Sequence, residues 1–336
     1  MSSSDLRIAF VGAGVVSGLH HAALARSSDA HLAGLFDVDQ DQAQLRSKEW
    51  GVTSFATYDE LLASDEVDAV FVLCTNRAHE ETALRAIDAG KHVLIEKPVA
   101  DEFGCARLAS RALASGVVCM PAHNYAYHPE FLRMLRLVRE GALGDIRVLW
   151  INYVLGHEED IAARYQGVVS ELLVHHSYLT YALMGPPDRI HAGRMRPGWK
   201  DLRRDDQAWM VWEYDTHASA HLFGSFAMDD DTADPWTFIV KVLGTEGGVT
   251  YSWRSAHLRG ATAAHRFSIP AYEESYEHEL AAFVRAVRGD PAAVVSTITD
   301  AGVVAQLLTG AGLATGVDQS DYTSNVFDTR VERPPS

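Results

Sequence analysis

The segment that decides the fold of this chain is Arg7-Ile8-Ala9-Phe10-Val11-Gly12-Ala13-Gly14-Val15-Val16-Ser17-Gly18. An apolar, strand-like run passes directly into a glycine-rich turn, and a helical stretch follows the turn. Gly12 permits a tight turn, and Gly14 lets the backbone approach a bound phosphate. The third position of this glycine fingerprint holds Ser17, which is still small enough for close packing of helix on strand. Because backbone N–H groups and a helix dipole meet at such a turn, we expect it to bind an anion.

The second strand-like run ends at Leu35-Phe36-Asp37, about 20 residues beyond the glycines. An acidic side chain at this place binds the ribose hydroxyls of a dinucleotide. The neighbours Val38 and Asp39 bring no positive charge that would neutralise a 2′-phosphate, so NAD(H) is favoured over NADP(H). The alternative is that Asp37 only caps the following helix. We predict NAD as the cofactor, with these contacts: Gly12, Gly14, Val15, Val16 and Asp37.

Strand-like and helical segments alternate up to about residue 121. The strand-like runs are Arg7–Val11, His31–Phe36, Ala69–Leu73, His92–Ile95 and Gly116–Met120. Amphipathic segments such as His79–Ala89 and Phe103–Ser115 lie between them. This alternation predicts right-handed βαβ units and a doubly wound parallel sheet, that is, an α/β Rossmann domain over residues 1–121.

The pattern changes after Pro121. Helical segments are expected at Pro129–Glu140, Gly167–Met184, Tyr276–Arg288 and Thr297–Gly316. Strand-like runs now follow one another directly: Ile146–Leu155, Arg189–Met195, Gln207–Tyr214, Ala218–Phe226, Phe238–Leu243 and Gly248–Trp253. Consecutive strands indicate a mainly antiparallel sheet. We therefore predict an α+β domain over residues 122–330, whose closing helix at about 297–316 is a candidate for packing back on the Rossmann domain.

The composition excludes several classes of partner. The chain carries 29 lysines and arginines against 45 aspartates and glutamates, a formal net charge of −16, so we expect no nucleic-acid partner. The sequence has no run of about 18 apolar residues, and its amino-terminal residues lack the features of a secretory signal, so we expect no membrane segment and no secretion. Three scattered cysteines (Cys74, Cys105 and Cys119) have neither metal nor disulfide spacing, which fits a reducing cytoplasm.

Two further segments carry a resemblance to a known family. The first reads Val72-Leu73-Cys74-Thr75-Asn76-Arg77-Ala78-His79, and the second, after Ala89-Gly90-Lys91-His92-Val93, ends in Glu96-Lys97-Pro98. With Asn124-Tyr125 and Glu140-Gly141-Ala142-Leu143-Gly144, nearly the whole chain resembles the glucose-fructose oxidoreductase / inositol dehydrogenase / MocA (Gfo/Idh/MocA) family. The resemblance implies a Rossmann domain that holds NAD(P), an open-faced, mainly antiparallel sheet domain, and a substrate between nicotinamide and sheet. It also implies a homodimer or homotetramer formed through the open face of that sheet.

The resemblance also implies a set of site residues. The residues expected to contact the cofactor at the carboxyl ends of the parallel strands are Cys74, Thr75, Asn76, His79, Glu96 and Lys97. The family's Asp-x-x-x-His motif, on the helix that enters the second domain, falls on Glu171 and His175. Because residues four apart share one helical face, we expect both side chains to point into the same cleft.

These residues suit hydride transfer at a carbon that bears a hydroxyl group. Oxidation of a secondary alcohol needs a hydride acceptor and a group that takes the hydroxyl proton. Lys97 is suited to hydrogen-bond the reacting oxygen, and His175 to exchange the proton because histidine titrates near neutral pH. Glu171 is suited to orient the imidazole or to adjust the local charge. Whether Lys97 or His175 is the formal acid/base stays open.

The expected substrate is a sugar, a sugar derivative or a cyclitol, whose hydroxyl groups need hydrogen-bond partners. The candidate partners are Lys97, Asn124, Asn152, His157, Arg164, Tyr165, Gln166 and His175. An NAD-dependent hydrolase or lyase that oxidises a sugar carbon transiently stays an alternative. A non-catalytic NAD or sugar sensor is a more remote one, because a sensor has no chemical need for Lys97 or His175.

A metal site near the Glu171–His175 motif is the last alternative. Glu171 and His175 are half of a ligand set, and His157-Glu158-Glu159-Asp160 lies upstream. We expect no metal, because the two histidines four apart of a zinc-hydrolase helix are missing.

Overall fold

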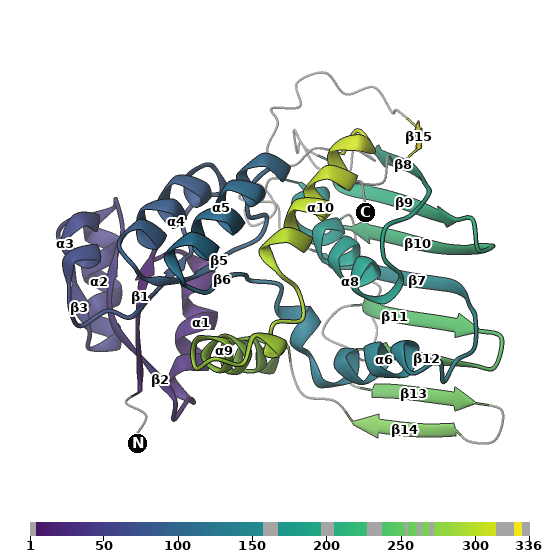
Figure 1. Ribbon diagram of the computed structural model, residues 1–336, viewed down its shortest axis with the longest axis horizontal. Coiled ribbons are helices and arrows are strands. Elements are labelled where there is room, and N and C mark those ends of the chain that lie inside the picture. Colours follow the sequence, from purple (N-terminus) through teal and green to yellow (C-terminus); the bar gives the residue numbers. More distant parts are fainter. Residues whose placement is uncertain are drawn as a thin grey trace. The chain divides into compact units, whose positions relative to one another are not determined.

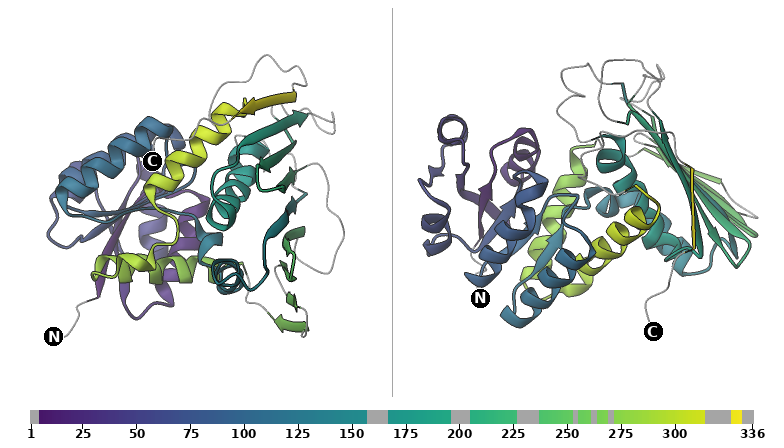
Figure 2. Two further views of the ribbon diagram at one scale, coloured as in Figure 1. Left: turned by 45° about the vertical axis from the view of Figure 1, so that its right-hand side comes forward. Right: turned by 90° about the horizontal axis from the view of Figure 1, so that it is seen from above.

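The structure is a computed structural model that describes residues 5–156, 167–195, 205–226, 237–252, 255–260, 264–268, 272–313 and 326–330. Figures 1 and 2 show its helices and strands. The chain divides into two compact units, of which the first consists of Met1–His128 and Tyr272–Val303 and the second of Pro129–Ala271 and Val304–Ser336. These units differ from the predicted ranges 1–121 and 122–330, because the chain returns to the first unit already at Tyr272, well before the predicted closing helix.

The first unit is built on a six-stranded parallel sheet with the order β3-β2-β1-β4-β5-β6, as predicted for a Rossmann domain. Its strands are β1 (Leu6–Val11), β2 (Ala30–Phe36), β3 (Thr53–Ser54), β4 (Ala69–Val72), β5 (His92–Ile95) and β6 (Cys119–Pro121). Every residue of β4 is buried, which explains why this strand reads as a continuous apolar run. The strand order reverses between β1 and β4, so a ligand is expected beyond the carboxyl ends of these two strands.

Five helices follow the strands of this sheet: α1 (Val15–Ala25), α2 (Gln40–Trp50), α3 (Tyr58–Ala63), α4 (His79–Asp88) and α5 (Glu102–Ser115). The core joins fully buried residues of helix and strand, for example Ile87 of α4, Leu108 of α5 and Val93 of β5. Gly116 ends α5 in the left-handed region, with φ of 66°. The strand predicted from Gly116 therefore begins only at Cys119.

The carboxyl-terminal part of the chain adds α9 (Glu274–Val287) and the start of α10 (Ile298–Gly310) to the first unit. On α9, Phe283 meets Phe71 of β4 with ring centroids 5.3 Å apart, and Glu277 pairs with Arg26 at the end of α1. The segment Pro291–Gly310, with a mean hydropathy of 1.4, is long and apolar enough to cross a membrane by composition alone. Because Ile298 and Ala301 pack into the core around the parallel sheet, we assign it as a core helix.

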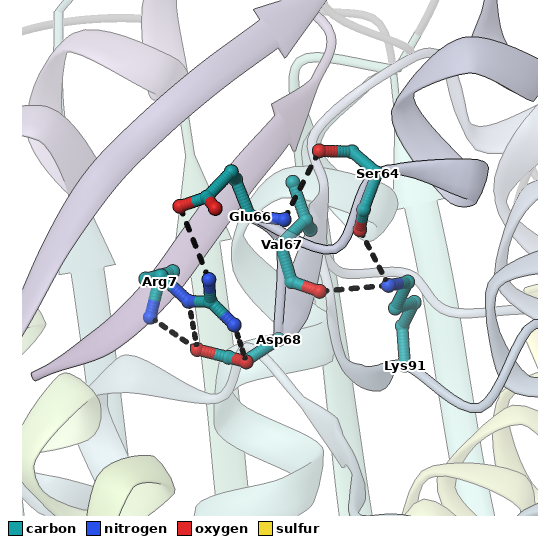
Figure 3. A network of polar contacts seen from close by, with 6 residues as sticks. All are labelled: Arg7, Ser64, Glu66, Val67, Asp68 and Lys91. Atoms are coloured by element: carbon teal, nitrogen blue, oxygen red, sulfur yellow. Dashed lines mark hydrogen bonds and ion pairs between the residues drawn. The ribbon is translucent and has the colours of Figure 1, made fainter. Parts of the chain in front are cut away.

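A network of charged residues lies at the amino ends of the parallel strands (Figure 3). The guanidinium of Arg7 donates to both carboxylate oxygens of Asp68, at 2.9 and 2.7 Å, and to Glu66 at 3.1 Å. Beside it, the ammonium of Lys91 donates to the carbonyl oxygens of Ser64 and Val67, at 2.9 and 2.8 Å. The hydrogen bond from Arg7 lowers the pKa of Asp68, so the carboxylate is ionised at neutral pH. We call this set, Arg7, Ser64, Glu66, Val67, Asp68 and Lys91, the amino-edge network.

The second unit is built on a nine-stranded sheet with the order β14-β13-β12-β11-β7-β10-β9-β8-β15. Its strands are β7 (Ile146–Val154), β8 (Arg189–Met195), β9 (Gln207–Tyr214), β10 (Ala218–Ser225), β11 (Thr237–Gly244), β12 (Gly247–Ser252), β13 (Ser255–Gly260), β14 (Ala264–Ser268) and β15 (Val326–Arg330). β7 and β10 pair in parallel and the other described pairs are antiparallel, which confirms the predicted mainly antiparallel sheet. The sequence analysis missed β13, β14 and β15, whose sequences lack a clear apolar alternation.

Helices cover one face of this sheet: α6 (Pro129–Arg139), the π-helical turn η3 (Val169–Leu173) and α8 (Val174–Met184). A Cβ at Gly224 of β10 would lie 2.8 Å from the side chain of Leu173, so a larger residue there would require Leu173 of η3 to shift. The side chains of β7 alternate between the two faces of the sheet. Ile151 and Tyr153 are buried, while Trp150 and Asn152 are exposed on the other face.

Candidate cofactor and active site

The glycine turn after β1 contains two glycines that serve different purposes. Gly12 has φ of +112°, and a Cβ there would lie 2.5 Å from the carbonyl oxygen of Leu73, so the fold itself requires glycine. Gly14 has an ordinary φ of −71°, and no atom lies within 4 Å of the position that its Cβ would take. Packing within the chain therefore does not require glycine at position 14, and the space beside its backbone is open.

The amino end of α1 is open to an anion. No side chain caps it at Gly14, and its first turn contains no acidic residue. Ser17, at the third position of the fingerprint, is buried and donates its hydroxyl to the carbonyl oxygen of Gly14 at 2.6 Å. Val15 is 75% exposed, so the backbone beside it is reachable from solvent. A helix start with free N–H groups and no acidic side chain attracts phosphate.

Asp37, at the end of β2, lies against this turn. Its Oδ2 accepts a hydrogen bond from the backbone N–H of Ala13 at 2.7 Å, and its Oδ1 accepts one from Asp39 at 2.9 Å. The cap of α2 is Asp39, which accepts from the N–H of Gln42 at 3.1 Å. The alternative that Asp37 serves only as a helix cap is therefore not needed, because the neighbouring residue has that role.

The carboxyl ends of β4 and β5 present the segments that the family resemblance singled out. Beyond β4, Thr75 is exposed, and Asn76 begins the short helix η1 (Asn76–Ala78). Cys74 is half-buried, and burial raises the pKa of its thiol, so it stays protonated at neutral pH. Beyond β5, Lys97 is half-buried, and its backbone N–H donates to Glu96 Oε2 at 3.0 Å.

Glu96 points into the interior and pairs with His20 of α1. Nε2 of His20 lies 3.0 Å from Glu96 Oε1, and both residues are buried. Burial alone would raise the pKa of Glu96, but the hydrogen bond and charge of His20, together with Lys97, hold that pKa below its usual value. Glu96 therefore carries a buried negative charge directly beside Lys97. The sequence predicts Glu96 as a cofactor contact. In the structure, both of its carboxylate oxygens are hydrogen-bonded to residues of the first unit.

A second carboxyl, Glu279 of α9, is subject to the charge of Glu96. It is fully buried, and neither of its oxygens has a hydrogen-bond partner among the described residues. Burial and the charge of Glu96 raise its pKa well above the usual value, so it is a neutral acid at neutral pH. The sequence analysis missed it, although an acidic residue three after Tyr276 and four before Phe283 interrupts an apolar helix face.

Asn124, a candidate substrate contact, lies in the short helix η2 (Asn124–Tyr127) of the first unit. Its side chain is 3% exposed, and its amide donates to the hydroxyl of Ser275 at 2.9 Å. Asn124 thus ties η2 to α9. The neighbouring Nδ1 of His123 lies 2.7 Å from the hydroxyl of Ser296, and burial lowers the pKa of His123 to about 3, so this ring is neutral.

The Glu171–His175 motif lies in the second unit, in η3 and α8. Nδ1 of the buried His175 lies 2.6 Å from the hydroxyl of Tyr178, also buried, and the two rings meet edge to face. The Tyr178 hydroxyl is therefore a hydrogen-bond partner of the imidazole at Nδ1. The sequence analysis missed Tyr178, which its spacing of three residues from His175 would have placed on the same helix face.

The remaining predicted residues do not all lie near the site. Asn152 lies on the opposite face of β7 from Tyr153, whose ring contacts His176, so it is not brought to the helix that carries His175. His157, Arg164, Tyr165 and Gln166 lie outside the described residues. Within the described ranges, no group of three or more His, Cys, Asp or Glu side chains is arranged to hold a metal ion. The predicted residues that do meet at one edge of the parallel sheet are Gly12, Gly14, Val15, Val16, Asp37, Cys74, Thr75, Asn76, Glu96 and Lys97. We call this set the carboxyl edge.

Both halves of the chain match one protein family. Residues 6–123 match the family described as "Oxidoreductase family, NAD-binding Rossmann fold", and residues 131–250 match the "GFO/IDH/MocA C-terminal domain".

Among curated proteins, a D-xylose 1-dehydrogenase (NADP(+)) of Haloferax volcanii is 29% identical over 284 residues, which cover 78% of this chain and 83% of the relative. Among solved structures, GenD2 from gentamicin A biosynthesis in complex with NAD is 25% identical, with a TM-score of 0.76 and 93% of each chain covered. An inositol dehydrogenase homolog of Azotobacter vinelandii, complexed with NADH and myo-inositol, has a TM-score of 0.79 at 19% identity, covers 91% of this chain and 94% of its own, and shows the shared fold.

Proposed function

Because the chain belongs to the GFO/IDH/MocA family of oxidoreductases, we propose that it transfers a hydride between NAD and a secondary alcohol or ketone carbon of a sugar, a sugar derivative or a cyclitol. The observation that carries the proposal is the carboxyl edge, where an uncapped helix start, the carboxylate of Asp37 and Lys97 lie at the ends of strands of one parallel sheet. Relatives named for D-xylose and glucose-6-phosphate support the substrate class.

The residues present fit a dinucleotide. The open space at Gly14 and the amino end of α1 suit its pyrophosphate, and the Asp37 carboxylate suits a ribose. When bound, the nicotinamide accepts or delivers the hydride. We propose NAD over NADP because Asp37 would repel a 2′-phosphate and neither Val38 nor Asp39 would neutralise it. The relative from Haloferax volcanii is named for NADP(+), so the preference of this chain for NAD over NADP is to be measured.

The chain's own residues then handle the proton. In the proposal, the ammonium of Lys97 hydrogen-bonds the reacting oxygen, and Glu96 beside it carries a buried negative charge. His175, whose Nδ1 is held by Tyr178, exchanges a proton through Nε2. Glu171 adjusts the charge along the same helix.

The test is the absorbance of reduced nicotinamide when purified protein meets NAD and a panel of sugars, sugar phosphates, cyclitols and glycosides, with product analysis alongside. We expect sustained NADH formation with at least one free sugar or cyclitol. Glycoside cleavage without NADH accumulation would replace the proposal by the internal-redox hydrolase or lyase. Binding of NAD without turnover of any compound would favour a sensor.

We also propose that the protein forms a homo-oligomer through the face of the nine-stranded sheet that carries Trp150. Trp150 is 39% exposed and Ile239 of β11 is 37% exposed, and Lys241 lies over the Trp150 ring at 5.6 Å. Large apolar side chains gathered on an exposed sheet face are typical of an interface. Sedimentation of wild type and Trp150→Glu tests this, and a monomeric wild type would contradict it.

A further inference from the structure

His79, the first residue of α4, has an environment that a surface or cofactor-contacting histidine would not have. Its exposed fraction is 0%. Its Nε2 lies 3.0 Å from the carbonyl oxygen of Cys74, and its Nδ1 lies 2.9 Å from the carbonyl oxygen of Pro98. The ring therefore bridges the chain just beyond β4 and the chain just beyond β5, one residue after Lys97.

Both partners of this ring are carbonyl oxygens, which only accept hydrogen bonds. A doubly protonated imidazole donates to both, whereas a neutral one donates from the single nitrogen that carries its proton. Burial lowers the pKa of His79 in spite of the two carbonyl contacts, so the neutral ring is favoured at neutral pH. Only the tautomer with its proton on Nδ1 donates to the carbonyl oxygen of Pro98, so the clamp uses that tautomer, and the ring packs against the carbonyl group of Cys74.

We propose that His79 is a positioning residue that clamps the Lys97–Pro98 segment to the end of β4 and so sets where the Lys97 ammonium stands. The role in turnover rests on the function proposed above for Lys97. His79 makes no contact with the cofactor in this proposal, because both ring nitrogens face the protein's own carbonyl groups. Loss of the bridge lets the Lys97 segment move relative to Thr75 and Asn76.

Three variants test the clamp. His79→Leu removes both ring nitrogens, His79→Gln restores one donor, and His92→Gln is the matched control. His92 is another histidine of this unit; it is partly buried, stands at the amino end of β5 and accepts from the N–H of Val118 at 3.0 Å. Each protein is measured for kcat, for NADH affinity by nicotinamide fluorescence, and for unfolding midpoint.

We expect His79→Leu to lower kcat about 10- to 100-fold with NADH affinity within about 3-fold of wild type, because displacement of a catalytic group by about 1 Å costs this much. His79→Gln should recover part of kcat, and His92→Gln should match wild type. An unchanged kcat in a folded His79→Leu would overturn the proposal. So would a loss of NADH affinity equal to the loss of kcat, which would make His79 a cofactor contact.

A second readout does not depend on turnover. With ¹⁵N-labelled histidine, the clamp predicts a His79 ring N–H that exchanges slowly with solvent and that is missing from the spectrum of His79→Gln. A ring N–H of His79 that exchanges at the rate of exposed histidines would refute the clamp. If wild type turned over no substrate while this slow N–H was present, the proposed function would fail and the clamp would stand.

Discussion

The two ends of the parallel sheet in the first unit are built in opposite ways. At the amino-edge network, the guanidinium of Arg7 pairs with the carboxylate of Asp68 (Figure 3). The ammonium of Lys91 donates hydrogen bonds to two backbone carbonyl oxygens. At the carboxyl edge, the start of α1 has no cap and Gly14 has empty space beside it. The difference is that the amino edge is closed by bonds within the chain, whereas the carboxyl edge leaves a helix start and the backbone at Gly14 open, which is how a fold separates stability from ligand binding.

Two lysines at opposite ends of β5 give the largest expected contrast. Lys97→Ala should lower kcat about 10²- to 10⁴-fold, because it removes the group that we propose bonds the reacting oxygen, while NADH still binds. Lys91→Ala should leave kcat near wild type and lower the unfolding midpoint, because its ammonium bonds two carbonyl oxygens far from the site. Steady-state kinetics and thermal unfolding of both variants check this, and full activity in Lys97→Ala would remove Lys97 from the mechanism.

The two glycines of the turn should separate folding from binding. Gly12→Ala should destabilise the protein by about 2 kcal/mol or more, because the new Cβ meets Leu73 and the backbone has φ of +112°. Gly14→Ala should leave the free energy of unfolding unchanged within about 0.5 kcal/mol and weaken NADH binding, because its Cβ meets no atom of the chain and lies where we propose that the pyrophosphate binds. Denaturant unfolding and NADH titration measure both. Equal NADH affinity in Gly14→Ala and wild type would show that the phosphates do not approach Gly14.

Glu279, whose pKa is raised by burial and by the charge of Glu96 of the carboxyl edge, should make stability depend on pH. Its folded-state pKa is raised, so the folded protein holds a proton that the unfolded chain releases, and stability falls as pH rises above about 4.3. Glu279→Gln removes that dependence and should be more stable than wild type by on the order of 1 kcal/mol at pH 8. Urea unfolding from pH 5 to pH 8 tests this. A difference that does not grow with pH would mean that Glu279 is ionised in the folded protein.

For Asp68 of the amino-edge network, the pH dependence of stability should have the opposite sign to that of Glu279. The effect of its substitution on stability should also be the smallest. Its folded-state pKa is lowered by Arg7, so its contribution to stability is present above its unfolded pKa and is lost as pH falls through the folded value. Asp68→Asn should cost under about 1 kcal/mol at pH 7, because the pair is partly exposed and screened. The cost should shrink below about pH 4. A constant cost across this range would point to packing, not charge.

Much of the fold of the first unit and of its carboxyl edge could be predicted from the sequence, because short local patterns determine them. The sequence predicts the parallel sheet from the strand, turn and helix around Gly12 and Gly14. It predicts the carboxyl edge from the strands that end before Asn76 and Lys97. Element boundaries were less secure where a glycine cap ends a helix, as Gly116 shows.

Contacts between distant segments could not be predicted. Nothing local links His20 to Glu96, 76 residues apart, or His79 to the carbonyl of Pro98, 19 residues apart. The return of α9 to the first unit, with Glu279 buried on it, depends on packing that no short motif records. The antiparallel strands near the end of the chain were missed because their residues do not alternate clearly.

The most direct test of the central claim, that the carboxyl edge holds NAD, is a fluorescence titration of the protein with NADH and with NADPH, repeated on Asp37→Ala. We expect wild type to bind NADH more tightly than NADPH, and Asp37→Ala to bind NADH more weakly and to lose most of that preference. Wild type that binds neither dinucleotide, or an unchanged preference in Asp37→Ala, would contradict the assignment of this edge.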